Sequence, residues 1–154
     1  MIELIIRILN KFITTLYKIV NWKTLRNATL YGTPRLIARD NIIVGKGVRI
    51  NGNVFIHGAG GVTIKENVTL SYGVTLLSTA YDTSNWSTNK VDKIHKNENI
   101  IIGKNVWLCA NVTVLPGIEI ADDIIIAAGA VVTKNLLESG WIYAGVPAKK
   151  IRKI

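Results

Sequence analysis

Apolar residues return at every sixth position along most of this chain. The longest series consists of Ile102, Leu108, Val114, Ile120, Ile126 and Val132, and each member has an apolar companion two positions before it. The same pairs occur earlier, at Val48 and Ile50, Val54 and Ile56, Val62 and Ile64, Val68 and Leu70, and Val74 and Leu76. A spacing of two places both side chains on one face of a short strand, and the return after six residues requires a turn between strands.

Turn-forming residues occupy the positions between these pairs. They are Gly45, Gly47, Asn51, Gly52, Asn53, Asn67, Gly73, Asn105, Pro116, Gly117, Asp122 and Gly129. Such residues readily adopt tight or left-handed backbone conformations. Three hexads would close a triangular coil of about 18 residues, and stacked coils would bury one apolar column. The sequence therefore predicts an all-β fold, a parallel β-helix over residues 25–154, because a period of six with β-branched residues does not fit an α-helix.

Two interruptions break the period. The step from Ile56 to Ile64 is eight residues and crosses a glycine-rich segment, so one corner is expected to carry an insertion. The larger break covers residues 77–99, which are mostly polar and include Trp86 and His95. Long loops in a compact solenoid are usually functional or disordered, so this excursion is where we expect chemistry.

Residues 1–24 follow a different rhythm. Polar residues recur at spacings of three and four, among them Glu3, Arg7, Lys11 and Lys18, and the opposite side is apolar, which predicts an amphipathic helix. The charges interrupt the apolar run and no small-residue cleavage site follows, so we predict neither a signal peptide nor a transmembrane span. The helix is expected either to pack along the domain or to bind in the plane of a membrane through residues 1–20.

The composition narrows the partners. The formal charge is +9, with 19 Lys and Arg against 10 Asp and Glu, so an anionic partner is expected. The basic residues are scattered, which argues against nucleic acid and favours a small anion or a membrane surface. Cys109 is the only cysteine, and His57 and His95 are the only histidines. This excludes an intrachain disulfide, disfavours a zinc site, and fits a reducing, cytoplasmic compartment.

From about residue 40 to residue 154 the chain resembles the hexapeptide-repeat, or left-handed parallel β-helix, acyltransferases. It is most similar to their maltose, galactoside and polysaccharide O-acetyltransferase branch, because the segments NVW, LPG, AAGAVVTK and AGVPAK occur in the family's order and spacing. The resemblance implies a left-handed coil, a homotrimer, and acetyl-CoA bound in the groove between neighbouring subunits. Carried over by position, the cofactor contacts would be Trp107, Ala110, Ala128, Thr133, Lys134, Lys149 and Arg152. Lys149 and Arg152 would then neutralise phosphate charge.

The catalytic histidine of this family does not match by position. Relatives carry it just after the strand that corresponds to Val74 and Leu76, where this chain reads STAYD over residues 78–82. Acetyl transfer to a hydroxyl needs a base and donors for the developing oxyanion. His95 is therefore the candidate base, with Asp82 to orient its imidazole and Tyr81 to contact the acceptor or the oxyanion. Otherwise the chain is a poor or inactive acetyltransferase.

The expected function is transfer of an acetyl group from acetyl-CoA to a hydroxyl of a sugar or glycan precursor, in the cytoplasm or at the inner face of the membrane. Two alternatives stay open: N-acetylation of an amino sugar, for which a weaker base suffices, and a catalytically inactive β-helix scaffold trimer. A gamma-type carbonic anhydrase shares the coil but needs three metal-binding histidines per site, so two histidines exclude it. We expect no metal.

Overall fold

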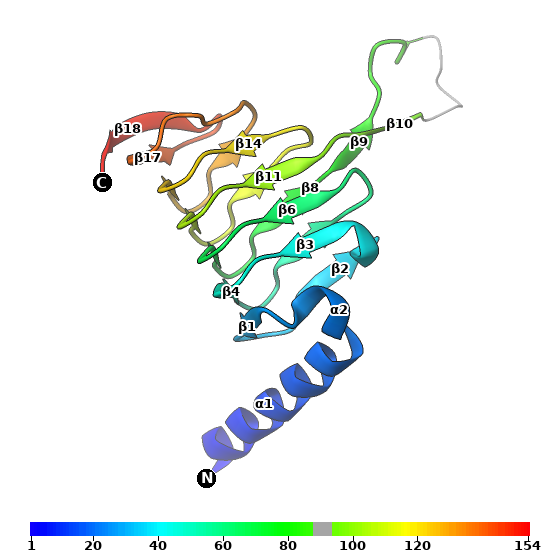
Figure 1. The fold of residues 1–154 in the computed structure, drawn as a ribbon, viewed down its shortest axis with the longest axis vertical. Helices are drawn as coiled ribbons and strands as arrows, with labels where there is room; N and C mark the ends of the chain where they lie inside the picture. The colour runs from blue at the N-terminus through cyan, green and yellow to red at the C-terminus, as the bar shows by residue number, and fades with distance from the viewer. Residues whose placement is uncertain (88–93) are drawn as a thin grey trace.

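The computed structural model describes residues 1–87 and 94–154, and most of them form a stack of triangular coils (Figure 1). Each coil contributes strands to three faces of a prism. Face 1 contains β1 (Ala28–Leu30), β4 (Val48–Ile50), β7 (Thr69–Leu70), β12 (Trp107–Leu108), β15 (Ile125–Ile126) and β17 (Trp141–Ala144). Face 2 contains β2 (Arg35–Ile37), β5 (Phe55–His57), β8 (Thr75–Leu77), β13 (Thr113–Val114) and β16 (Val131–Val132). Face 3 contains β3 (Ile42–Val44), β6 (Val62–Ile64), β11 (Ile100–Ile102) and β14 (Glu119–Ile120).

The interior of the prism is the predicted apolar column. Every residue of the hexad pairs named above is buried, with at most 6% of its surface exposed. Strands pair in parallel from coil to coil, so equivalent residues stack: Leu70, Leu108 and Ile126 share one register on face 1. The prediction of a parallel β-helix is confirmed.

Many corners follow the predicted turn chemistry, whereas Ala38, Asn111 and Asp123 have positive φ without having been predicted. Asn67 and Asn105 have positive φ, at 59° and 55°, and each donates its backbone N–H to the coil before it. Their side chains form a ladder in which Asn67 Nδ2 donates to Asn105 Oδ1 and Asn105 Nδ2 donates to Asp123 Oδ1. At the next step Asp123, rather than the predicted Asp122, has positive φ (57°). Asp122 instead accepts the Lys104 N–H through Oδ1 at 2.7 Å.

The structure adds a coil before the first hexad predicted from the sequence. β1, β2 and β3 form it, and the short 3-10 helix η1 (Arg39–Asn41) lies at its corner between faces 2 and 3. The inserted corner predicted between Ile56 and Ile64 is confirmed, since Gly61 N–H closes a turn onto Gly58 O. The extra residues therefore recur at one edge of the prism in successive coils.

The excursion leaves the prism at this same edge as a two-stranded arm. β9 (Thr79–Tyr81) and β10 (His95–Asn97) pair antiparallel and project beyond the coils (Figure 1). The excursion starts later than predicted, because Leu77 still belongs to β8 and pairs with His57. Ser78 is fully buried, where its Oγ donates to His57 O at 2.6 Å. Residues 88–93 of the predicted excursion lie outside the described residues.

The prediction of an N-terminal helix is also confirmed. α1 (Ile2–Val20) projects from the first coil, and the short α2 (Trp22–Leu25) joins it to the prism (Figure 1). Leu25 is buried against the core, whereas no residue of α1 is buried. Among the described residues, no helix is long and apolar enough to cross a membrane.

The far end of the prism is closed by a hairpin. β18 (Lys149–Lys153) turns back antiparallel on β17. The connecting segment rests on face 2, where Val131 N–H donates to Gly145 O and Ala148 N–H donates to Val131 O. The segment that resembles the family's C-terminal motif therefore lies beside the last coil.

Candidate active site

The arm brings two of the three predicted catalytic residues together. The antiparallel register places His95 opposite Tyr81, and their rings lie 4.6 Å apart between centroids. His95 Nδ1 is 3.5 Å from the Thr79 Oγ1 atom on the neighbouring strand. A donor hydrogen on Nδ1 that meets this hydroxyl leaves the lone pair on Nε2, which is the form that a general base requires.

Asp82 is engaged elsewhere. Its Oδ1 accepts the backbone N–H of Ser84 at 2.9 Å. This bond lowers the pKa of the carboxyl most, followed by a hydrogen bond from the Ser84 side chain and, less strongly, the charge of Lys96. The side-chain oxygen next to the His95 imidazole is the Thr79 hydroxyl, not the Asp82 carboxylate. Sequence reasoning did not single out Thr79, and only the antiparallel register shows its proximity to His95. The orienting role of Asp82 stays a prediction.

The opposite side of the arm is charged. Lys96 pairs with Glu98 at 2.9 Å, and this carboxylate raises the pKa of the lysine. Lys96 lies opposite Ala80 in the ladder, on the side away from His95 and Tyr81. The arm thus presents a histidine and an aromatic ring on one side and an ion pair on the other.

The residues predicted for the acyl arm of acetyl-CoA lie along face 1 and its next corner. Trp107 is on β12 with 47% of its side chain exposed, and its Nε1 donates to Ser71 Oγ at 2.9 Å. Ala110 and Ala128 follow β12 and β15 at equivalent corners of successive coils. The Ala110 carbonyl accepts the Gly129 N–H at 2.9 Å, so the two corners stack directly. The result is an edge of small residues next to an exposed indole.

The other predicted cofactor contacts, of which Lys149 and Arg152 were expected at the phosphates, lie near the end of the prism. Thr133 and Lys134 follow β16 and are exposed, as are Lys149 and Arg152 on β18. Lys150, which the sequence reading did not select, lies 4.0 Å from the centroid of the Trp141 ring and pairs with Glu138. The hairpin therefore presents a basic strand, part of which is already fixed by an aromatic ring.

One chain does not bring His95 and Trp107 together. The arm leaves the prism between β8 on face 2 and β11 on face 3, and that edge is opposite face 1 in a triangular coil. Trp107 lies on face 1. A site that uses both His95 and Trp107 therefore needs the arm of one chain and face 1 of another.

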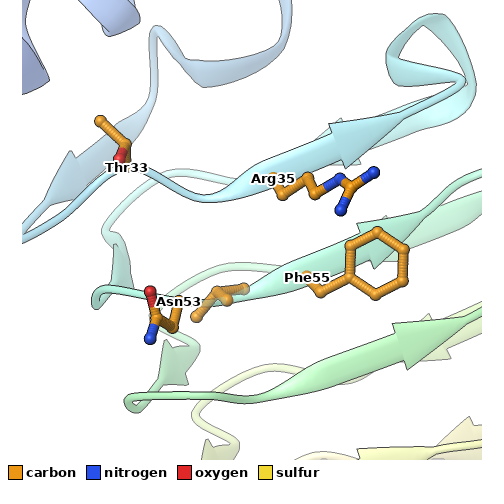
Figure 2. Close-up of a pocket in the computed structure, with 5 residues that line it drawn as sticks. Thr33, Arg35, Asn53 and Phe55 are labelled. Carbon is orange, nitrogen blue, oxygen red and sulfur yellow. The ribbon is translucent and has the colours of Figure 1, made fainter.

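A shallow depression of about 280 Å³ lies on the first coils of face 2. Figure 2 shows Arg35 and Phe55 side by side on this face, with Thr33 and Asn53 near the preceding corner. The Arg35 guanidinium carbon lies 5.7 Å from the centroid of the Phe55 ring. None of the predicted catalytic or cofactor-binding residues lines this depression.

Two other features bear on the chemistry. Cys109 is half-buried, and burial raises the pKa of its thiol, so it is a poor nucleophile. Across residues 1–87 and 94–154, no cluster of three or more His, Cys, Asp and Glu side chains is placed to hold a metal ion.

Comparison with known proteins relates this architecture to a family. The model of the family described as bacterial transferase hexapeptide (six repeats) matches residues 99–134. The galactoside O-acetyltransferase of Escherichia coli strain K12 is 34% identical over 119 residues, which cover 74% of this chain and 55% of that protein. The chain thus spans about half the length of the curated relatives it matches.

Solved structures agree with this relationship. A galactoside acetyltransferase in complex with coenzyme A aligns with a TM-score of 0.75 and 32% identity, over 82% of this chain and 62% of that one. A maltose O-acetyltransferase from Clostridium difficile 630 aligns with a TM-score of 0.73 and 28% identity, over 82% of this chain and 66% of that one. The fold is therefore the left-handed parallel β-helix of these acetyltransferases, and residues 99–134 match the hexapeptide-repeat transferase family.

Proposed function

We propose that this protein is an acetyl-CoA-dependent acetyltransferase that acts as a homotrimer on a hydroxyl of a sugar or glycan precursor. The observation that carries the proposal is the separation of His95 from Trp107 on opposite sides of one prism. In a trimer of parallel prisms the arm of each subunit can reach face 1 of its neighbour. The relatives named above act on sugars, and one of them was solved with coenzyme A bound.

Each residue then has a chemical role. His95 Nε2 takes the proton of the acceptor hydroxyl as its oxygen attacks the thioester carbonyl carbon. Tyr81, whose ring lies against the imidazole, contacts the acceptor or donates to the oxyanion. As the tetrahedral intermediate collapses, the carbon–sulfur bond breaks and the imidazolium returns its proton to the departing thiolate. The products are the acetyl ester and free coenzyme A.

The donor is proposed to lie along the exposed indole of Trp107 and the stacked corners at Ala110 and Ala128. These small residues leave backbone groups open to an extended acyl arm. Thr133, Lys134, Lys149 and Arg152 are all exposed toward the end of the prism, where the positive charges of Lys149 and Arg152 suit the phosphates of the donor. A lone half-buried thiol fits a reducing compartment, so we propose a cytoplasmic location.

The proposed base can be tested by measuring acetyl-CoA-dependent thiol release over a panel of sugars and amino sugars. We expect His95→Ala to lower kcat by about 10² to 10⁴, the usual contribution of a general base. His57→Ala is the matched control, because His57 accepts the Ala59 N–H within its own corner and is expected to leave the rate unchanged. Full activity in His95→Ala would contradict the assignment, and a response to amino sugars alone would establish N-acetylation.

The shared site can be tested separately by co-expressing two impaired variants. His95→Ala and Trp107→Ala subunits that mix at random should restore roughly a quarter of the wild-type sites, because one interface in four receives an intact arm and an intact face 1. Each variant alone should stay impaired. If mixing restores nothing while both variants form trimers, His95 and Trp107 do not serve the same site.

A further inference from the structure

Helix α1 carries an apolar surface that none of the described residues buries. Its large apolar side chains occupy about half of the helix circumference. They are Ile2, Leu4, Ile5, Ile6, Ile8, Leu9, Phe12, Ile13, Leu16, Ile19 and Val20, and each has between 46% and 74% of its surface exposed. An apolar patch of this size on an isolated chain indicates a binding surface.

The direction of this surface is unusual for an amphipathic helix. The residues of α1 that line a depression against the first coil, opposite Leu30 and Tyr31, are its polar ones: Arg7, Asn10, Lys11 and Thr14. Lys18 on the same polar side donates to the carbonyl of Ala28. The polar side therefore faces the prism and most of the apolar side faces away from it, the reverse of a helix that packs its apolar side on its own core.

The charge and width of the helix indicate what covers it. α1 has three basic residues, Arg7, Lys11 and Lys18, and one acidic residue, Glu3. A bundle of α1 helices from three subunits would bury only the narrow seam that a coiled coil uses and leave much of this arc in water. A lipid surface accepts the whole arc, and anionic headgroups match the basic residues. Trp22, which follows the helix with 58% exposure, is a residue type typical of the membrane interface.

We propose that α1 lies in the plane of an anionic membrane, with its apolar side among the acyl chains and the exposed Arg7 and Lys11 at the headgroups. The prism then stands with its first coil nearest the lipid. In the proposed trimer three such helices would bind together, so a weak contact of each becomes a firm one. The membrane contact uses none of the residues assigned to acetyl transfer, so it does not depend on the proposed activity.

The experiment measures flotation of the full-length protein with lipid vesicles. One set consists of phosphatidylcholine alone, and the other contains about one third phosphatidylglycerol as the anionic lipid. Leu9→Asp places one negative charge on the apolar side, and Asn10→Asp, the matched control, places the same charge on the polar side. We expect wild type and Asn10→Asp to float with anionic vesicles, and Leu9→Asp to bind them at least about tenfold more weakly.

Two further measurements keep the outcomes distinct. Because no residue of α1 is buried, Leu9→Asp should retain the thermal unfolding midpoint and the acetyl-transfer rate of wild type, so lost flotation reports the surface alone. Wild type that fails to float with anionic vesicles overturns the proposal. The proposal is also overturned if wild type does not bind vesicles and light scattering shows that Leu9→Asp has a lower oligomeric state than wild type. In that case a second copy of the chain covers the helix. Equal binding to neutral and anionic vesicles would refute the part assigned to Arg7 and Lys11.

Discussion

The prism and the arm are both built from strands of two to five residues, but they are held by different interactions. Apart from β2 and β18, the strands of the prism place one or two side chains each in an interior where at most 6% of their surface remains exposed. β9 and β10 bury none of their residues and depend on an antiparallel ladder, the Tyr81–His95 ring contact and the Thr79–His95 contact. Burial restricts the interior positions of the prism to apolar residues, whereas the side chains of the arm remain accessible to other molecules.

If burial stabilises the prism, a cavity in its interior should be far more destabilising than the same truncation on its surface. Leu108 is fully buried between Leu70 and Ile126, so Leu108→Ala should lower the free energy of unfolding by about 2 to 5 kcal/mol. Leu137→Ala makes the same change where 63% of the side chain is exposed and should cost less than about 1 kcal/mol. Chemical denaturation monitored by circular dichroism measures both. Similar losses in the two variants would show that the column is not what stabilises the coils.

The corners offer a smaller test of the same contrast. Asn105 has positive φ, accepts from Asn67 and donates to Asp123, so its side chain ties three coils together. Asn105→Ala removes both hydrogen bonds and leaves alanine in a left-handed conformation, which should cost about 1 to 2 kcal/mol. Asn105→Gly removes the same hydrogen bonds without the conformational penalty and should be less destabilising. Denaturant midpoints of the two variants separate the two contributions.

The hexad rule explains why the sequence predicts the interior so well. An apolar pair every six residues can be buried only by a coil of this size, and the burial of both members of each pair follows. On faces 1 and 2 the first coil escaped the rule because its inward positions include the small Ala28 and the cyclic Pro34, both buried. The corner of this coil between faces 2 and 3 has Ala38 at a φ of 51°, and an alanine in the sequence does not predict a left-handed turn.

The candidate site was predictable only in part, for a related reason. Histidine in a polar excursion points to chemistry, and this selected His95. Its neighbours depend on the register of β9 against β10, which no periodicity encodes, so Thr79 was missed. The Asp82 carboxylate accepts the Ser84 N–H, and its role in orienting His95 stays a prediction. The position of Trp107 on the face opposite the arm could not be predicted, because assigning each strand to a face requires knowing every corner of the coils.

The smallest expected effect is a local change in the arm when the Asp82 carboxyl takes up a proton. The Ser84 N–H lowers the pKa of the Asp82 carboxyl, so the ionised form stabilises this turn at neutral pH, and the stabilisation is lost as the pH falls through that lowered pKa, below about 4. The amide resonance of Ser84 should shift in this range, and Asp82→Asn, which keeps an acceptor oxygen, should abolish the shift. The polar residues buried in the described structure, Asn21, Thr24 and Ser78, include no carboxylate, so resonances of the interior should stay constant. If the Ser84 amide resonance shifted with a midpoint above about pH 4, the Asp82 carboxylate would not be held by this hydrogen bond and would be free to orient His95.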